Sequence, residues 1–298
     1  MNARLLLSVP TDIPTRLIQF ACWMSLSLTY ASVSVADIND ADEVYIHSQP
    51  HIEVELIAEA PQDGHSPPRV GVVYRPAPGW HVYWKNPGDS GLPMTIKWCE
   101  GMTVDDLNWP SPESIPYGPL INLGYKTDAL IWASYKINQE QSVISARTTW
   151  LACKDECVPG GATLVLDLAS LTDGQKAAAT AVFDEAKSSF PQPFPLMDAK
   201  AEIDEGKLKL AIYANTPQIF SAKADSGELP EVEVFIENQD LVEYGDPEKI
   251  QAVNNMLIWE QNLSEFKTKN PERVRAVIVV DQEAAYNLEI SLQNRDSI

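Results

Sequence analysis

The sequence HIEVELIA at residues 51–58 alternates apolar and polar side chains along most of its length. A period of two places the apolar side chains on one face of a β-strand, so this stretch predicts a half-buried strand. Proline- and glycine-containing turn segments follow at residues 76–79, 86–88 and 110–119. Many short strands separated by such turns predict an antiparallel sandwich of immunoglobulin type. The other predicted strands of this part are residues 69–75, 81–84, 94–98, 130–137, 143–151 and 162–168.

A different pattern follows the first strand set. Apolar residues recur at helical spacing over residues 171–190, behind Thr172 and Asp173, which are typical of a helix start. Three prolines between residues 191 and 195 predict the end of the helix and a stiff linker. Further strands are predicted at residues 207–213, 232–236, 273–280 and 288–292. We therefore predict a mainly β protein, with two immunoglobulin-like β-sandwich domains at residues 37–170 and 198–298, joined by a helix and a proline-rich linker at residues 171–197.

The first 36 residues have the pattern of an export signal. Arg4 and Arg16 precede an uncharged, mostly apolar stretch that ends in the small-x-small sequence SVA at residues 34–36. Acidic residues begin at Asp37, so we predict a signal peptide at residues 1–36 that is cleaved before Asp37. An uncleaved membrane anchor is the alternative, because about 20 residues just span a bilayer. Cleavage would place the mature chain in an oxidising compartment, where disulfides persist.

The composition argues against nucleic acid as a partner. The chain has 298 residues, of which 45% are hydrophobic and 21% are charged, as in globular proteins. Lysine and arginine total 22 against 42 aspartates and glutamates, which gives a formal net charge of −20. A surface this acidic repels phosphate backbones.

Two of the four cysteines, Cys153 and Cys157, form a C-x-x-x-C pair within WLACKDECVPGG at residues 150–161. In an extended chain their Cα atoms would lie roughly 13 Å apart, whereas a disulfide needs about 4.4–6.8 Å, so they pair only if the chain turns between them. Strand-like residues on both sides predict a strand end or a hairpin. A bond that closes so small a ring adds only about 2 kcal/mol to stability and suits opening and closing better than holding a fold. Asp155 and Glu156, partly offset by Lys154, disfavour a thiolate, which suits a disulfide opened by a partner's thiolate.

Other interpretations of the cysteines and histidines stay open. The pair also fits an inert structural disulfide, or a Cu(I) site held by two soft thiolates. Zinc would need two more ligands, which the neighbouring sequence does not offer, so we expect no metal and no cofactor. His47 and His51 are four residues apart in a strand-like region and are predicted to be ordinary surface histidines. Cys99 is predicted to be a buried or half-buried thiol without an assignable partner.

The longest motif in the chain is WHVYWKNPGDSGLP at residues 80–93. With WP at residues 109–110, GY at residues 124–125 and the cysteine segment, it resembles the N-terminal periplasmic domain of DsbD/ScsB-type thiol:disulfide interchange proteins. The second strand set, around residues 234–236 and 275–280, resembles the extra β domain of the ScsB-like branch. The resemblance covers nearly all of the chain after residue 36.

The resemblance implies a protein-disulfide reductase relay in the periplasm. In this family a membrane domain carries electrons from the cytoplasm, and the N-terminal domain passes them to periplasmic thioredoxin-fold proteins through its cysteine pair. The resemblance implies that Cys157 forms the mixed disulfide with the partner and that Cys153 resolves it. Well-known members space the pair more widely and shield it with a cap loop, for which residues 79–92 are the candidate here.

The chain, which ends at Ile298, matches neither the membrane domain nor the C-terminal thioredoxin-like domain of the family. A stand-alone periplasmic protein, a subunit fed by a separate membrane protein and an incomplete gene product are all compatible with this. The alternative from a different functional class is a non-catalytic β-sandwich interaction module.

Overall fold

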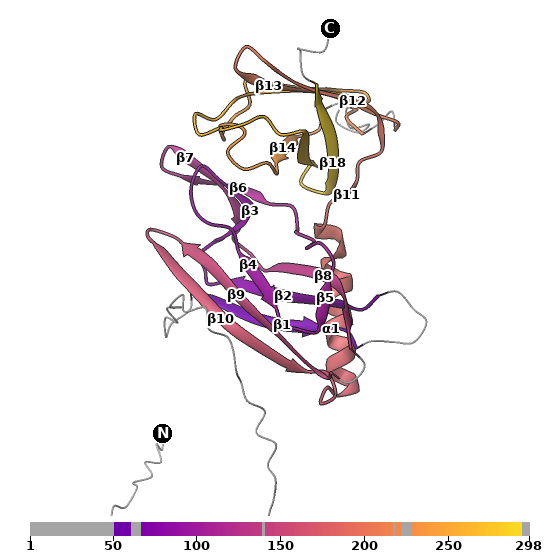
Figure 1. Ribbon diagram of the computed structural model, residues 1–298. Coiled ribbons are helices and arrows are strands. Elements are labelled where there is room, and N and C mark those ends of the chain that lie inside the picture. Colours follow the sequence, from indigo (N-terminus) through magenta and orange to yellow (C-terminus); the bar gives the residue numbers. More distant parts are fainter. Residues whose placement is uncertain (1–50, 61–66, 139–140, 217–218, 222–227, 294–298) are drawn as a thin grey trace, which may run out of the picture. The chain divides into compact units, whose positions relative to one another are not determined.

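The computed structural model describes residues 51–60, 67–138, 141–216, 219–221 and 228–293. In this part of the chain the protein is mainly β with one α-helix, as the sequence predicts (Figure 1). The predicted signal peptide lies outside the described residues. Among those described, no helix has the length and apolar character needed to cross a membrane.

The first strand set forms three small antiparallel sheets. The first has the order β1-β2-β8-β5, the second β10-β9-β4 and the third β3-β7-β6. The strands are β1 (Ile52–Ala58), β2 (Arg69–Pro76), β3 (Val82–Gly88), β4 (Thr95–Trp98), β5 (Met102–Val104), β6 (Glu113–Tyr117), β7 (Leu120–Tyr125), β8 (Ala129–Ile137), β9 (Val143–Cys153) and β10 (Cys157–Asp167).

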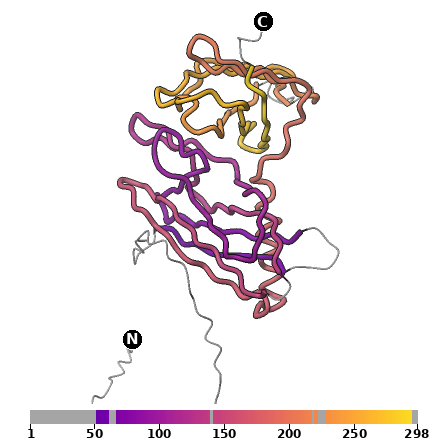
Figure 2. Tube along the Cα trace, viewed as in Figure 1, coloured from indigo at the N-terminus to yellow at the C-terminus, as the bar shows by residue number. Residues whose placement is uncertain are grey.

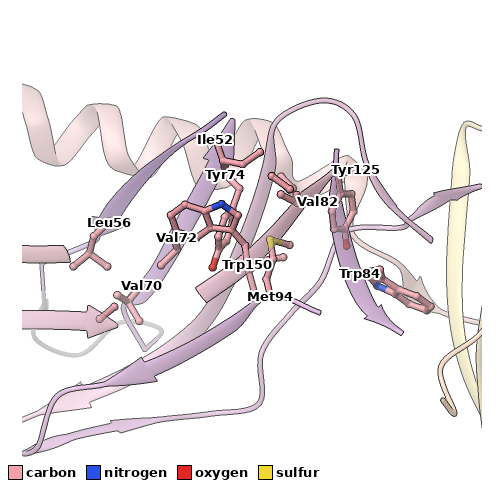
Figure 3. Close-up of a cluster of buried hydrophobic side chains, with 14 of the residues drawn as sticks. Ile52, Leu56, Val70, Val72, Tyr74, Val82, Trp84, Met94, Tyr125 and Trp150 are labelled. Atoms are coloured by element: carbon pink, nitrogen blue, oxygen red, sulfur yellow. The ribbon is translucent and has the colours of Figure 1, made fainter. Parts of the chain in front are cut away.

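A continuous hydrophobic core joins these sheets. Strand β9 buries every second side chain between Ile144 and Trp150, as the period of a half-buried strand requires. Those side chains meet Val72 and Tyr74 from β2, and Figure 3 shows Trp150 beside Tyr74 within this cluster. Burial of this apolar surface is the main force that holds the three sheets together.

The predicted helix forms and covers the other face of the first sheet. Helix α1 (Asp173–Glu185) begins with a capping box, in which Thr172 and Gln175 satisfy each other's backbone groups, and continues as the 3₁₀ turn η1 (Ala186–Ser189). Phe183 and Phe190 lie with their rings edge-on to Trp132 of β8. The first sheet is therefore buried on both faces.

The second strand set forms one mixed sheet of eight strands, which Figure 1 shows curling into a nearly closed barrel. Its path order is β14-β17-β18-β12-β13-β16-β15, and β11 pairs with β18. The strands are β11 (Gln192–Pro193), β12 (Leu196–Asp204), β13 (Lys207–Ala214), β14 (Val232–Ile236), β15 (Lys249–Val253), β16 (Met256–Asn262), β17 (Arg273–Val280) and β18 (Ala284–Gln293).

This arrangement differs from the two facing-sheet sandwiches predicted from the sequence. In the second set β12 pairs with β13 on one side and with β18 on the other, so the strands stay in one sheet. In the first set β3, β7 and β6 form a small sheet of their own, and the pairing of β3 with β7 shifts register between Tyr83 and Gly88.

Two segments predicted as turns are strands. Strand β6 lies inside residues 110–119, and its Pro116 is tolerated because β6 is an edge strand of its sheet. Strand β3 continues through residues 86–88. The predicted linker is likewise partly strand, because β11 pairs with β18 and β12 begins at Leu196.

The two strand sets share part of one core. Phe235, Val277 and Val279 belong to the second set by sequence, yet they pack into the hydrophobic cluster of the first set. The trace in Figure 2 passes from the first set to the second near residue 190. The described residues accordingly belong to one compact unit.

Candidate functional site

Cys153 and Cys157 form a disulfide at the end of the β9–β10 hairpin. The two residues are directly opposite in the strand pairing, and their Cα atoms are 4.1 Å apart. The chain turns through residues 154–156, with Lys154 N donating to Glu156 O at 3.1 Å. The predicted hairpin location and the turn between the cysteines are therefore confirmed.

The two sulfur-bearing residues differ in exposure. Cys153 is fully buried, whereas Cys157 and the three residues of the turn are exposed. Backbone hydrogen bonds between Cys153 and His81, 3.0 Å in each direction, tie Cys153 to the start of β3. An attacking sulfur from solvent can therefore reach Cys157 more easily than Cys153.

Tyr83 of β3 supplies the polar contact to the disulfide. Its hydroxyl donates to Sγ of Cys153 at 2.9 Å and lies 3.9 Å from Sγ of Cys157. Burial, with a smaller contribution from Tyr117, raises the pKa of Tyr83 to about 12. The phenol therefore stays protonated at neutral pH and remains a donor.

A short hydrogen-bond chain holds the Tyr83 hydroxyl in place. Asn122 of β7, itself buried, donates from Nδ2 to the Tyr83 hydroxyl at 3.3 Å. Ser90 in turn donates to Oδ1 of Asn122 at 2.7 Å. Gly91 lies against the Tyr83 ring so closely that a Cβ atom there would be 2.2 Å from Cε1 of the ring. Residues 83–91 and 122 thus fix the phenol on the sulfur.

His81 packs against Tyr83. The two rings meet edge to face, with centroids 5.2 Å apart, and the imidazole is 5% exposed. Burial, together with the charge of Lys126, lowers the pKa of His81, so the imidazole is neutral at pH 7. Its Nε2 has no hydrogen-bond partner within the described residues.

The β10 side of the hairpin depends on a close backbone approach. The sequence predicts a strand that starts at residue 162, but β10 already begins at Cys157 and runs through residues 159–161. Gly160 lies over the indole of Trp150, where a Cβ atom would be 2.4 Å from the ring. The glycine is therefore required by packing and not by a turn.

The other residues singled out in the sequence lie away from the disulfide. Cys99 is a half-buried free thiol, as predicted, and its sulfur accepts from Gln141 Nε2 and Ser145 N. His51 is half-buried and stacks on Trp80 at 3.6 Å between centroids, so it is not an ordinary surface residue as predicted. His47 lies outside the described residues. Among the described residues, no three His, Cys, Asp or Glu side chains gather as they would around a metal ion.

The sequence reasoning missed the residues that surround the disulfide. Tyr83 and Ser90 lie inside the long motif at residues 80–93, and this motif is the sequence feature that could have pointed to them. Asn122 has no such signal, because it lies in β7, a strand that was not predicted. Residues 79–92, the candidate cap, contribute Tyr83 to the contact with the sulfurs.

The site is a small-ring disulfide at the end of a hairpin in a mainly β fold. A buried tyrosine hydroxyl donates to one of its sulfurs. Residues 53–169 match the family profile described as the N-terminal part of the thiol:disulfide interchange protein DsbD. This part of the chain therefore belongs to the DsbD N-terminal domain family.

One solved structure extends the fold match over most of the chain. The N-terminal periplasmic domain of ScsB from Proteus mirabilis is similar over 83% of this chain and 95% of its own, at 16% identity and a TM-score of 0.63. The N-terminal domain of Neisseria meningitidis DsbD in the reduced form is matched over 38% of this chain and 82% of its own, at 15% identity and a TM-score of 0.27. No curated protein sequence matches the chain.

Proposed function

We propose that the protein exchanges thiols and disulfides in the periplasm, relaying reducing equivalents through Cys153 and Cys157 to thioredoxin-fold partners. The observation that carries the proposal is the asymmetry of the disulfide, with Cys157 exposed and Cys153 buried under the Tyr83 hydroxyl. Membership of residues 53–169 in the DsbD N-terminal family supports it. In this proposal residues 37–170 are the redox domain, residues 171–197 the connection and residues 198–298 a second domain.

Reduction of the site proceeds in two exchange steps. A partner thiolate bonds to Sγ of Cys157, the bond between Cys157 and Cys153 breaks, and its electron pair goes to Sγ of Cys153. Tyr83 donates its hydrogen bond to the thiolate that forms there. A second thiolate of the partner then attacks the mixed disulfide and releases Cys157, which leaves a dithiol here and a disulfide in the partner. The reverse sequence, begun by the Cys157 thiolate, reduces a client.

The first test compares enzymatic with chemical reduction. A reduced thioredoxin should open the wild-type disulfide faster than dithiothreitol at the same concentration, measured by alkylation and intact mass. Full reduction should lower the thermal midpoint by only about 4–8 °C, because the small ring contributes about 2 kcal/mol to stability. Equal rates, or a large fall in the midpoint, would instead indicate a structural disulfide.

The second test assigns the roles of the two sulfurs. A single-cysteine thioredoxin carrying thionitrobenzoate on its nucleophilic sulfur is mixed with single-site variants, and release of the chromophore is followed. Cys153→Ser should form the covalent complex quickly through exposed Cys157, while Cys157→Ser should react slowly because Cys153 is buried. Cys99→Ser, added to both backgrounds, removes the free thiol of the described residues as a control. Faster trapping through Cys153 would reverse the two roles.

A further inference from the structure

Strand β3 links the redox site to the second strand set. The three residues after Tyr83 all contact the segment 235–239, which begins in β14. The ring of Trp84 lies edge-on to Phe235, and Figure 3 shows Trp84 at one end of the buried cluster. Lys85 Nζ lies 2.6 Å from a carboxylate oxygen of Glu237, whose side chain is 14% exposed, and Gln239 donates to the Lys85 carbonyl at 2.7 Å.

Asn86 makes the most buried of these contacts. Its side chain is 1% exposed, and Nδ2 donates to the carbonyl of Ile236 at 2.7 Å and to the Tyr244 hydroxyl. A buried amide is costly unless it is hydrogen-bonded, so these partners hold Asn86 in one position.

The oxygen of the same amide bonds within its own chain segment. Oδ1 of Asn86 accepts from the backbone N–H of Gly88 at 3.2 Å, which holds the end of β3 just before Ser90. Ser90 donates to Asn122, and Asn122 donates to the Tyr83 hydroxyl that contacts Cys153. The Asn86 side chain thus joins β14 to the end of β3 and, through Ser90 and Asn122, to the Tyr83 hydroxyl.

We propose that Asn86 is a positioning residue through which the second strand set holds the Tyr83 hydroxyl on Cys153. The inference rests on the proposed function, since it gives the second strand set a part in disulfide opening. Without the anchor, the end of β3 and residues 89–90 relax and Tyr83 loses its fixed donor geometry. The thiolate leaving from Cys153 is then less stabilised, and opening slows because the rate depends on the leaving sulfur.

The test is a double-mutant cycle in the rate of disulfide opening by dithiothreitol, followed by alkylation and intact mass well below the thermal midpoint. Asn86→Ala should slow opening at least about threefold, as expected for the loss of a hydrogen bond. Asn86→Ala combined with Tyr83→Phe should be no slower than Tyr83→Phe alone, because both act through one group. A purely structural role for Asn86 would lower the thermal midpoint and leave the opening rate unchanged, which would overturn the proposal.

Two further variants make the result decisive. Asn255→Ala is the matched control. Asn255 also donates from its side-chain amide to a backbone carbonyl, that of Ala214 in β13. The Asn255→Ala variant should leave the opening rate unchanged. If Asn86→Ala does not fold, Tyr244→Phe removes only one partner of the Asn86 amide and should still slow opening; an unchanged rate there would contradict the proposal. Failure of the proposed function is seen separately, since wild-type protein would then show no preference for thioredoxin over dithiothreitol.

Discussion

The hydroxyl of Tyr83 donates a hydrogen bond to Sγ of Cys153 at 2.9 Å, and it contacts the buried sulfur more closely than the exposed one. In an exchange that begins at Cys157, the buried sulfur is the one that leaves with the electron pair. A donor aimed at the leaving sulfur stabilises the charge that develops there. The exposed sulfur stays free for attack by a partner.

Tyr83→Phe should slow the opening of the disulfide. The substitution removes the donor while keeping the buried ring, and a hydrogen bond to a charged acceptor is worth about 1.5 kcal/mol, or roughly tenfold in rate. Opening by dithiothreitol, quenched with an alkylating reagent, measures the effect. Tyr125→Phe is the control, since the Tyr125 hydroxyl donates to the Pro110 carbonyl and should leave the rate unchanged. Equal slowing in both variants would show a general loss of packing.

The contribution of Tyr83 should be independent of pH in the neutral range. Burial raises the pKa of Tyr83 to about 12, so the neutral donor form persists at every pH well below that value. The ratio of wild-type to Tyr83→Phe opening rates should therefore stay constant between about pH 7 and pH 9. A ratio that decreases between pH 7 and pH 9 would mean that another group controls the reactivity of the sulfur.

The raised pKa of Tyr83 also makes the stability of the protein depend on pH. The unfolded phenol ionises near pH 10 and the folded one near pH 12, so the contribution of Tyr83 to stability is present below pH 10 and is lost as pH rises toward 12.

The cysteine pair and the hairpin that carries it were predictable from the sequence. Alternation in β9 and the small spacing between Cys153 and Cys157 are local signals, and the structure follows them. The strand after the cysteines was predicted to start at residue 162, whereas β10 starts at Cys157 and its Gly160 makes room for the Trp150 ring. The contact between Gly160 and Trp150 joins residues on opposite strands, so it produces no periodic pattern in the sequence.

The polar contacts around the disulfide were not predictable for a related reason. Tyr83, Ser90 and Asn122 come from two strands and a loop, and only the fold brings them to Cys153. Strand β6 was missed because its proline is a turn signal, although an edge strand tolerates it. Thr172, by contrast, was predicted as a helix start because capping depends on near neighbours in the chain.

Gly160→Ala should destabilise the protein. The added Cβ atom would lie 2.4 Å from the indole of Trp150, so the hairpin or the ring must shift, at a cost of about 1–3 kcal/mol. Urea unfolding followed by tryptophan fluorescence measures the change in free energy. Gly174→Ala is the control, since its Cβ would meet only Thr172 Oγ1 at 4.0 Å and alanine favours the helix. A Gly160→Ala protein as stable as wild type would show that the hairpin adapts at no cost.

The exported chain should begin at Asp37. The apolar stretch before it ends in a small-x-small sequence, which is typical of a cleavage site. Intact mass of the protein recovered from the periplasmic fraction measures the start directly. A chain that keeps Arg4 and sediments with membranes would establish the uncleaved anchor instead.

Arg69→Met should loosen helix α1 from the first sheet. The Arg69 guanidinium lies 2.7 Å from Glu59 and 3.0 Å from Asp184 of α1, and it stacks over the Phe183 ring. Methionine keeps the aliphatic stem but loses these interactions, so the free energy of unfolding should fall by about 2 kcal/mol. Arg273→Met, at a more exposed ion pair with Glu289, should change stability by less than about 0.5 kcal/mol.

The difference between Arg69→Met and wild type should shrink in acid. The hydrogen bond from Arg69 holds the pKa of Glu59 below its ordinary value of 4.5, so the folded carboxylate resists protonation. Its contribution is therefore fully present above pH 4.5 and is lost as pH falls through the lowered pKa. Urea unfolding at pH 7 and at successive values below pH 4.5 should show wild-type stability approaching that of the variant. A difference that stays constant through this range would mean that Arg69 acts through Phe183 and not through Glu59.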